Sequence, residues 1–151
     1  MIIGEIIKWC RTNKKFTQEE MAAALHITPQ AISRWETGTN VLIVDDAPFM
    51  RMMLKEILSS DGHTIIQATN GEECLTILET TPIDTCILDI NMPVMDGMQA
   101  LTIIKNKYPQ IKVIMLSAQC TEDTVQKALL FGADGFVAKP FAANTILERM
   151  Y

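Results

Sequence analysis

Ile87-Leu88-Asp89-Ile90-Asn91-Met92-Pro93 places one carboxylate, that of Asp89, inside a short apolar run that a proline ends. A short, continuous apolar run is typical of a strand that is covered on both faces of a parallel sheet. In open α/β sheets, ligands bind beyond the carboxyl ends of the strands. We therefore expect Asp89 to lie at the edge of a sheet, held on a rigid element and reached by solvent.

Other polar side chains also follow short apolar runs, and these are Asp45 with Asp46, Ser117, and Lys139. If all of these runs are strands of one parallel sheet, their carboxyl ends meet at the same edge. The sequence therefore predicts that the three carboxylates, the hydroxyl and the ammonium gather around Asp89.

From residue 40 onward, a strand-like run and a helix-like run alternate five times. The expected strands are residues 41–44, 63–68, 84–88, 111–116 and 135–138, and the expected helices are residues 48–60, 71–79, 97–107, 121–131 and 142–150. Short connections between such units are typical of a doubly wound parallel α/β sheet with helices on both faces. No sixth unit is indicated.

Residues 1–39 have a different, all-helical pattern. A first amphipathic helix is expected at residues 2–12, with an apolar face made of Ile3, Ile6, Ile7 and Cys10. Thr17-Gln18-Glu19-Glu20 is a capping box that starts a second helix, whose inward residues are expected to be Met21, Ala24 and Leu25. His26 stands at a tight turn that often carries glycine or asparagine. Thr28-Pro29 starts a third helix, which Gly38 ends.

Composition limits the class of protein. A chain of 151 residues with 48% hydrophobic content is long enough to bury a core. The net charge of −5 argues against a surface coated for nucleic acid, although residues 1–39 carry +1 and leave −6 for the remainder. The four cysteines are scattered, so we expect reduced, mostly buried thiols in a cytoplasmic protein. Neither a membrane span nor a signal peptide is indicated.

The stretch FTQEEMAAALHITPQAISRWETGTN resembles the helix-turn-helix of the Cro and phage-repressor type. The resemblance implies that Gln18 touches a DNA phosphate and that Gln30, Ser33 and Arg34 face the major groove. It also implies that the recognition helix is held on the core by Ala31, Ile32 and Trp35. Small polar residues at the start of a helix, followed by an arginine, suit groove binding.

This helical segment is incomplete by comparison with that family, whose domains are five-helix bundles. The pattern stops after the third helix, and only Thr39 and Asn40 precede the first strand. A segment of about 40 residues buries too little surface to be stable alone. We therefore expect its apolar faces to pack on residues 40–151 or on a second copy of the chain. The abrupt junction at residues 38–40 is compatible with a gene fusion and with an engineered chimera.

Residues 40–151 resemble the receiver domain of two-component response regulators. The motifs that carry this resemblance are VLIVDDAPFMRMML, ILDINMPVMDG, MLSA and FVAKPF. The resemblance implies a flavodoxin-like (βα)5 fold with strand order 2-1-3-4-5. The PFMRMML helix is similar to that of the stand-alone, CheY-like chemotaxis regulators.

Three carboxylates at one sheet edge repel one another unless a cation lies among them, and oxygen ligands suit Mg²⁺. The resemblance implies that Asp46, Asp89 and the Asn91 carbonyl bind Mg²⁺, with Asp45 acting through water. Asp89 would accept a phosphoryl group from a sensor histidine kinase, and Ser117 and Lys139 would hold its oxygens. Such a protein is a phosphoacceptor with self-phosphorylation and self-dephosphorylation chemistry rather than an enzyme.

The resemblance also implies a switch, in which Ser117 moves toward the phosphoryl group and Phe136 turns into the vacated space. The surface that changes comprises the fourth helix, fifth strand and fifth helix of the receiver. Two outputs stay open: binding to a downstream protein, and control of DNA binding by the helix-turn-helix. A metal-dependent phosphatase is a third alternative, but the sequence offers no acid for the leaving group.

Overall fold

Five parallel strands form one sheet in this computed structural model, which describes residues 3–29, 32, 36 and 39–150. The strands are β1 (Asn40–Val44), β2 (Thr64–Ala68), β3 (Thr85–Asp89), β4 (Lys112–Ser117) and β5 (Gly135–Ala138). Their order across the sheet is β2-β1-β3-β4-β5, which confirms the expected α/β fold and strand order. Every neighbouring pair is parallel.

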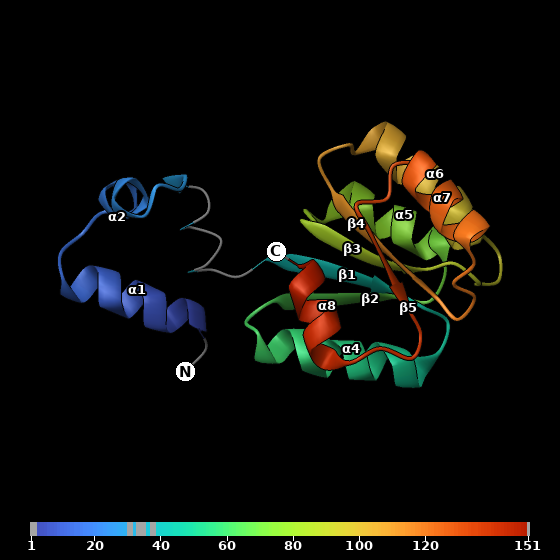
Figure 1. The fold of residues 1–151 in the computed structure, drawn as a ribbon, viewed down its shortest axis with the longest axis horizontal. Helices are drawn as coiled ribbons and strands as arrows, with labels where there is room; N and C mark the ends of the chain where they lie inside the picture. Colours follow the sequence, from blue (N-terminus) through green and yellow to red (C-terminus); the bar gives the residue numbers. More distant parts are fainter. Residues whose placement is uncertain (1–2, 30–31, 33–35, 37–38, 151) are drawn as a thin grey trace.

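Helices cover both faces of this sheet (Figure 1). They are α4 (Pro48–Ser60), α5 (Gly71–Thr80), α6 (Gly97–Lys107), α7 (Glu122–Leu130) and α8 (Ala143–Arg149). The helices α4 and α8 lie on one face, and α5, α6 and α7 lie on the other. Each strand end is thus close to a loop that leads into a helix, which is the arrangement that creates ligand sites in this fold class.

Alternate residues of the strands build two separate apolar cores, because successive side chains of a strand point to opposite faces. Leu42, Leu88 and Met115 belong to the core beneath α5, α6 and α7. Ile43 and Ile87 belong to the core beneath α4 and α8. A strand buried on both faces reads as a continuous apolar run, which is why these runs could be recognised in the sequence.

Local signals explain where most helices begin. The side chains of Asn70, Asp96 and Thr121 each accept a hydrogen bond from the backbone amide three residues ahead, at the starts of α5, α6 and α7. Pro48 occupies the first position of α4, where its missing N–H is not needed. These caps account for the close agreement between the expected and observed boundaries after residue 40.

The N-terminal segment contains α1 (Ile3–Asn13) and α2 (Gln18–Leu25). The expected capping box is present, with Thr17 and Glu20 bonded to each other's backbone amides. His26 has a φ of 57°, so the turn adopts the left-handed conformation that its position indicated. Of the third helix, Pro29, Ile32 and Glu36 are helical. Its other predicted residues lie outside the described part of the chain, and they are Gln30, Ala31, Ser33, Arg34, Trp35 and Thr37.

The expected inward faces of α1 and α2 are partly wrong. The side chains of Ile6 and Leu25 are 44% and 49% exposed, Cys10 and Ala24 are also exposed, and Ala22 is buried instead. Helical periodicity shows which side chains share a face, but it does not show whether anything covers that face. The expectation of mostly buried thiols is met for Cys74 and Cys86 only, because Cys10 and Cys120 are exposed.

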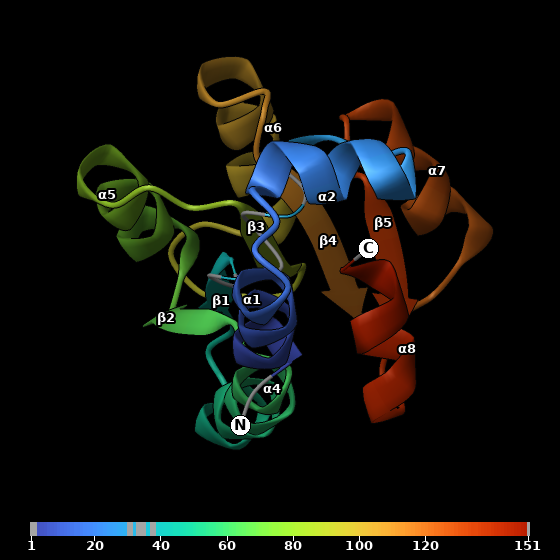
Figure 2. The ribbon, with the colours of Figure 1, turned by 90° about the vertical axis from the view of Figure 1, so that its left-hand side faces the viewer.

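The N-terminal helices lie beyond the edge of the sheet from which β1 starts (Figures 1 and 2). Thr39 and Asn40 join the sheet there, since their carbonyl groups accept hydrogen bonds from the amides of Thr64 and Asp84. The Thr39 hydroxyl also contacts Nδ1 of the buried His63 at 2.7 Å. The strand ends that carry Asp89 are at the opposite edge. No helix among the described residues is long and apolar enough to cross a membrane.

Candidate functional site

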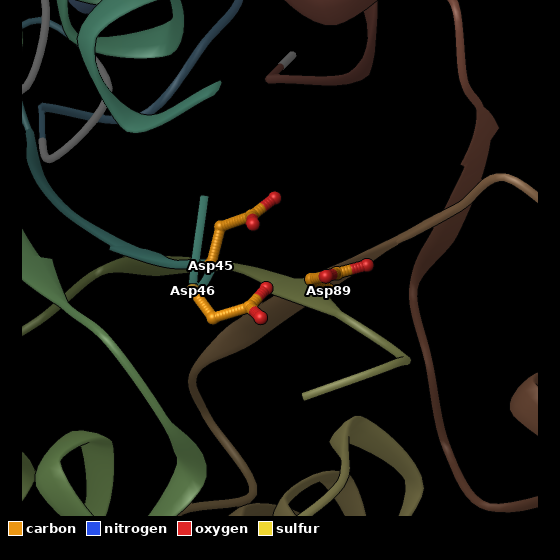
Figure 3. Close-up of side chains that lie close together, drawn as sticks. All are labelled: Asp45, Asp46 and Asp89. Carbon is orange, nitrogen blue, oxygen red and sulfur yellow. The ribbon is translucent and has the colours of Figure 1, made fainter. Parts of the chain in front are cut away.

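Three carboxylates meet where β1 and β3 end (Figure 3). One oxygen from each of Asp45, Asp46 and Asp89 lies within 4.8 Å of the other two. Asp45 and Asp89 are buried, whereas Asp46 is exposed. Within the part of the chain that the structure describes, no other group of three acidic, histidine or cysteine residues could hold a metal ion.

The sheet register brings these residues together. β1 and β3 are parallel neighbours with Val44 opposite Leu88, so the next residues, Asp45 and Asp89, lie side by side where the two strands end. The Asp45 amide still donates to the Ala68 carbonyl of β2 at 3.2 Å, which keeps the residue aligned with the sheet. Strand pairing alone therefore brings Asp45 and Asp89, which are far apart in the chain, to one site.

Lys139 enters the cluster from the other side, directly after β5. Its Nζ lies 2.9 Å from Oδ2 of Asp45 and 3.2 Å from Oδ1 of Asp89. Its amide donates to the Ser117 carbonyl at 2.8 Å, so the end of β4 fixes the lysine backbone. Burial by itself lowers the pKa of Lys139, but hydrogen bonds and charges from the two aspartates raise this pKa above its ordinary value.

The pKa of Asp89 is raised above its ordinary value. Burial is the main cause, and the negative charge of Asp45 adds to it, while Lys139 opposes both. Asp89 therefore lies in a site where negative charge is costly without a further cation. Such an imbalance is common at functional sites, where groups are arranged for binding rather than for stability.

Asp45 is held by protein groups on several sides. Its Oδ1 accepts a hydrogen bond from the Ala47 amide at 2.9 Å, and its Oδ2 accepts one from Lys139 at 2.9 Å. Its backbone carbonyl accepts a third hydrogen bond from the Arg51 guanidinium at 2.7 Å. With both carboxylate oxygens already bonded, Asp45 is the acid of the three that is least free to turn.

Ser117 is the last residue of β4 and Phe136 lies within β5, and their predicted roles in a switch stay predictions. The Ser117 hydroxyl is buried and exchanges hydrogen bonds of 3.0 Å with the backbone of Gln119. Phe136 is partly buried and packs against the core beneath α5, α6 and α7. Both residues therefore have definite partners from which a switch would have to release them.

The loop between β3 and α6 approaches the site closely. A Cβ added to Gly97 would lie 2.2 Å from the Asp89 carbonyl oxygen, so no larger residue fits this position. The same loop contains Asn91, which is exposed, and whose carbonyl role stays a prediction. Val94 has a φ of 69°, a conformation that β-branched residues rarely adopt.

The donor set of this cluster fits Mg²⁺. All three groups are carboxylates where β1 and β3 end, and neither histidine nor cysteine is among them. Hard oxygen ligands of this kind suit Mg²⁺, which keeps several waters and is completed by a phosphate. A divalent cation would also offset the burial and the charge of Asp45, which raise the pKa of Asp89.

A second polar cluster lies in the N-terminal segment. The guanidinium of Arg11 bonds the carboxylate of Glu36, and the side-chain amide of Gln18 donates to the same carboxylate at 2.9 Å. Gln18, expected to touch a DNA phosphate, thus has an internal partner in this structure. The other expected DNA contacts, Gln30, Ser33 and Arg34, lie outside the described residues.

Two contacts were not foreseen from the sequence. Arg51 stands in the first turns of a helix that follows the acid pair, and helical side chains point back toward the N-terminus, so its reach to Asp45 could have been anticipated. Arg11 and Glu36 are separated by 25 residues, and no local pattern signals that pairing.

Comparison with known proteins decides the family. Residues 41–151 match the profile of the response regulator receiver domain. The chain belongs to the response regulator receiver family. Residues 7–42 match a helix-turn-helix profile, so the receiver follows a helix-turn-helix segment.

Several curated relatives of this receiver are chemotaxis proteins. The chemotaxis protein CheY of Listeria monocytogenes is 44% identical over 111 residues, which are 73% of this chain and 93% of the relative. The chemotaxis protein CheY of Bacillus subtilis is 42% identical over 111 residues, covering 73% of this chain and 92% of the relative. Neither match extends over the whole of this chain, which is longer by the helix-turn-helix segment.

Solved structures give the same result. Chemotaxis protein CheY4 of Vibrio cholerae superposes with a TM-score of 0.71 at 30% identity, covering 74% of this chain and 95% of that one. The CheY of Borrelia burgdorferi, solved in a complex with CheX, BeF3 and Mg²⁺, has a TM-score of 0.71 at 40% identity. That match covers 74% of this chain and 86% of the other.

Proposed function

We propose that this chain is a signalling receiver that is switched by phosphorylation of Asp89. The observation that carries the proposal is the placement of a buried aspartate between an acid pair and a lysine. The phosphodonor is a phosphohistidine on a sensor histidine kinase, the partner class that the family implies. The domain that performs this chemistry comprises residues 40–151.

The transfer forms a bond between an Asp89 oxygen and phosphorus while the bond from phosphorus to the histidine nitrogen breaks, and the imidazole leaves. Lys139 and Ser117 hold two of the equatorial phosphoryl oxygens, since this reaction depends on positioning and charge neutralisation. Mg²⁺, when bound by Asp46, Asp89 and the Asn91 carbonyl, with Asp45 acting through water, supplies the remaining positive charge. Water that attacks the acyl phosphate returns the carboxylate and releases phosphate.

The switch begins at Ser117. A phosphoryl group on Asp89 adds negative charge and acceptor oxygens, which attract the Ser117 hydroxyl away from Gln119. Phe136 then turns toward the vacated space, and the surface formed by α7, β5 and α8 changes shape. That surface binds the downstream protein. Leu129, Leu130 and Phe131 are exposed at the end of α7, so apolar contact area is already present there.

The Asp89→Asn variant tests the site assignment. We expect it to abolish acid-labile labelling by acetyl phosphate with Mg²⁺, because an amide oxygen is not a nucleophile for this transfer. Asp96→Asn is the matched control, since Asp96 caps α6 in the same loop and asparagine caps equally well. Full labelling of the Asp89→Asn protein would overturn the proposal.

A second function is favoured by one observation, the helix-turn-helix match over residues 7–42. In that case phosphorylation controls DNA binding through Gln18, Gln30, Ser33 and Arg34. We favour protein binding as the output because the chain carries a net charge of −5 and its helical bundle is incomplete. DNA binding that weakens steeply with salt would support the second function, and no binding at low salt would exclude it.

A further inference from the structure

We propose that Arg51 is a positioning residue, which holds the turn between β1 and α4 in the shape that Mg²⁺ binding requires. This inference rests on the proposed function. Arg51 lies on α4 and is partly buried, and its Nη1 donates a hydrogen bond to the Asp45 carbonyl at 2.7 Å. This hydrogen bond reaches the Asp45 backbone and not a carboxylate, so Arg51 acts through the backbone of the acid pair.

The geometry of the helix explains the contact. Side chains of an α-helix point back toward its N-terminus, so a long side chain near the start of α4 reaches the strand end before it. The N-cap residue of α4, Ala47, has no side chain able to cap the helix. The hydrogen bonds that hold the turn from Asp45 to Pro48 therefore include one from the Ala47 amide to the Asp45 carboxylate and one from Arg51 to the Asp45 carbonyl.

Lys139 and Arg51 bind two different groups of Asp45. Lys139 bonds the carboxylate at 2.9 Å, and Arg51 bonds the carbonyl. Loss of the Arg51 contact frees the Asp45 carbonyl, and with it the peptide that leads into Asp46. Asp46 follows Asp45 directly and is the exposed member of the acid cluster, so its position depends on this turn.

The positive charge of Arg51 and its hydrogen bond to Asp45 predict opposite effects of its removal on Mg²⁺ affinity. Removal of a cation beside three carboxylates, by charge alone, tightens the binding of a divalent cation. Loss of a positioning contact weakens it. We expect Arg51→Gln to weaken Mg²⁺ binding by about fivefold, the scale of one hydrogen bond. Arg51→Lys, which keeps a donor, should recover part of the loss.

Titration calorimetry of the unphosphorylated full chain with Mg²⁺ gives the first measurement. Lys55→Gln is the matched control, because it removes an exposed cation one turn further along α4 and should change the affinity less than twofold by screening. Mg²⁺ affinity in Arg51→Gln equal to or tighter than that of the unmodified chain would overturn the inference.

Amide hydrogen exchange of Ala47 in the metal-free protein gives the second measurement. We expect about tenfold faster exchange in Arg51→Gln and no change in Lys55→Gln, since the amide is protected by the turn that Arg51 holds. Unchanged protection in Arg51→Gln would contradict the inference. If the unmodified chain binds no Mg²⁺, the proposed function fails, and Ala47 exchange alone then decides the role of Arg51.

Discussion

The charged form of the Asp89 side chain destabilises the folded chain when no metal is bound. Burial and the charge of Asp45 raise the pKa of Asp89, and Lys139 offsets them only in part. The folded chain then binds the Asp89 proton more tightly than the unfolded chain does. Stability contributed at this position is therefore present at acid pH and lost as pH rises through the interval between the unfolded and folded pKa values. Function here is obtained at the expense of stability.

We expect Asp89→Asn to raise the free energy of unfolding at neutral pH by about 1 kcal/mol. The gain should vanish below the ordinary pKa of aspartate, where the native carboxyl is also neutral. Urea denaturation at several pH values without Mg²⁺ measures both effects, with Asp96→Asn as the control. A variant less stable than the unmodified chain at neutral pH would show that the Lys139 ion pair outweighs burial.

Gly97 is required by close packing rather than by its conformation. Its added Cβ would lie 2.2 Å from the Asp89 carbonyl oxygen and 2.7 Å from the Ile90 Cα. We expect Gly97→Ala to lower the free energy of unfolding by about 3 kcal/mol, because backbone must move to admit the methyl group. Gly135→Ala is the control, since its nearest neighbour would be at 3.7 Å, and denaturation should detect little change there.

At the scale of elements, the N-terminal segment depends on an ion pair that crosses it. The hydrogen bond from Arg11 lowers the pKa of Glu36 below its ordinary value although burial raises it, and Gln18 adds to the lowering. A depressed carboxyl pKa contributes stability that is present above the unfolded pKa and is lost as pH falls through the folded pKa. This direction is opposite to that of Asp89.

We therefore expect acid to unfold the N-terminal segment. Both tryptophans of the chain, Trp9 and Trp35, belong to residues 1–39, so tryptophan fluorescence reports that segment alone. Glu36→Gln should remove the acid transition, whereas Glu19→Gln, at an exposed carboxylate, should leave it in place. An identical acid midpoint in Glu36→Gln and the unmodified chain would contradict the assignment.

The receiver elements could be predicted from the sequence more completely than the N-terminal ones. Strands such as β3 are buried on both faces and read as continuous apolar runs, and α6 has an acidic cap and a glycine at its start. In α1 and α2, by contrast, the periodic faces were expected to be inward and are partly exposed. Periodicity is local, whereas burial depends on elements elsewhere in the chain.

At the scale of the whole molecule, exposed apolar side chains gather on the N-terminal segment. The side chains of Ile6, Trp9, Phe16 and Leu25 are between 44% and 59% exposed. Exposed apolar groups of this kind mark association surfaces when they are contiguous. The resemblance to five-helix bundles implies that two closing helices are missing here, and a second copy of the chain is the partner that we expect to replace them.

Sedimentation velocity across the micromolar range should therefore show a concentration-dependent dimer. The double variant Trp9→Glu with Leu25→Glu should shift the chain to monomer, because it places charges in the contact. Leu130→Glu changes a side chain that is 81% exposed on α7 and should leave the association unchanged. A chain that is monomeric at all concentrations would contradict this expectation.

The sequence by itself determined the alternation of strands and helices, the residues at the strand ends and the helix caps, because periodicity, capping and turn chemistry are local. Only the tertiary structure decided that Lys139 bonds Asp45 across 94 residues, that Arg51 holds the Asp45 carbonyl, and that Gln18 bonds Glu36. The exposure of α1 and α2 was likewise decided by what packs against them. Contacts between distant residues depend on register and on neighbouring elements, and one stretch of sequence contains neither.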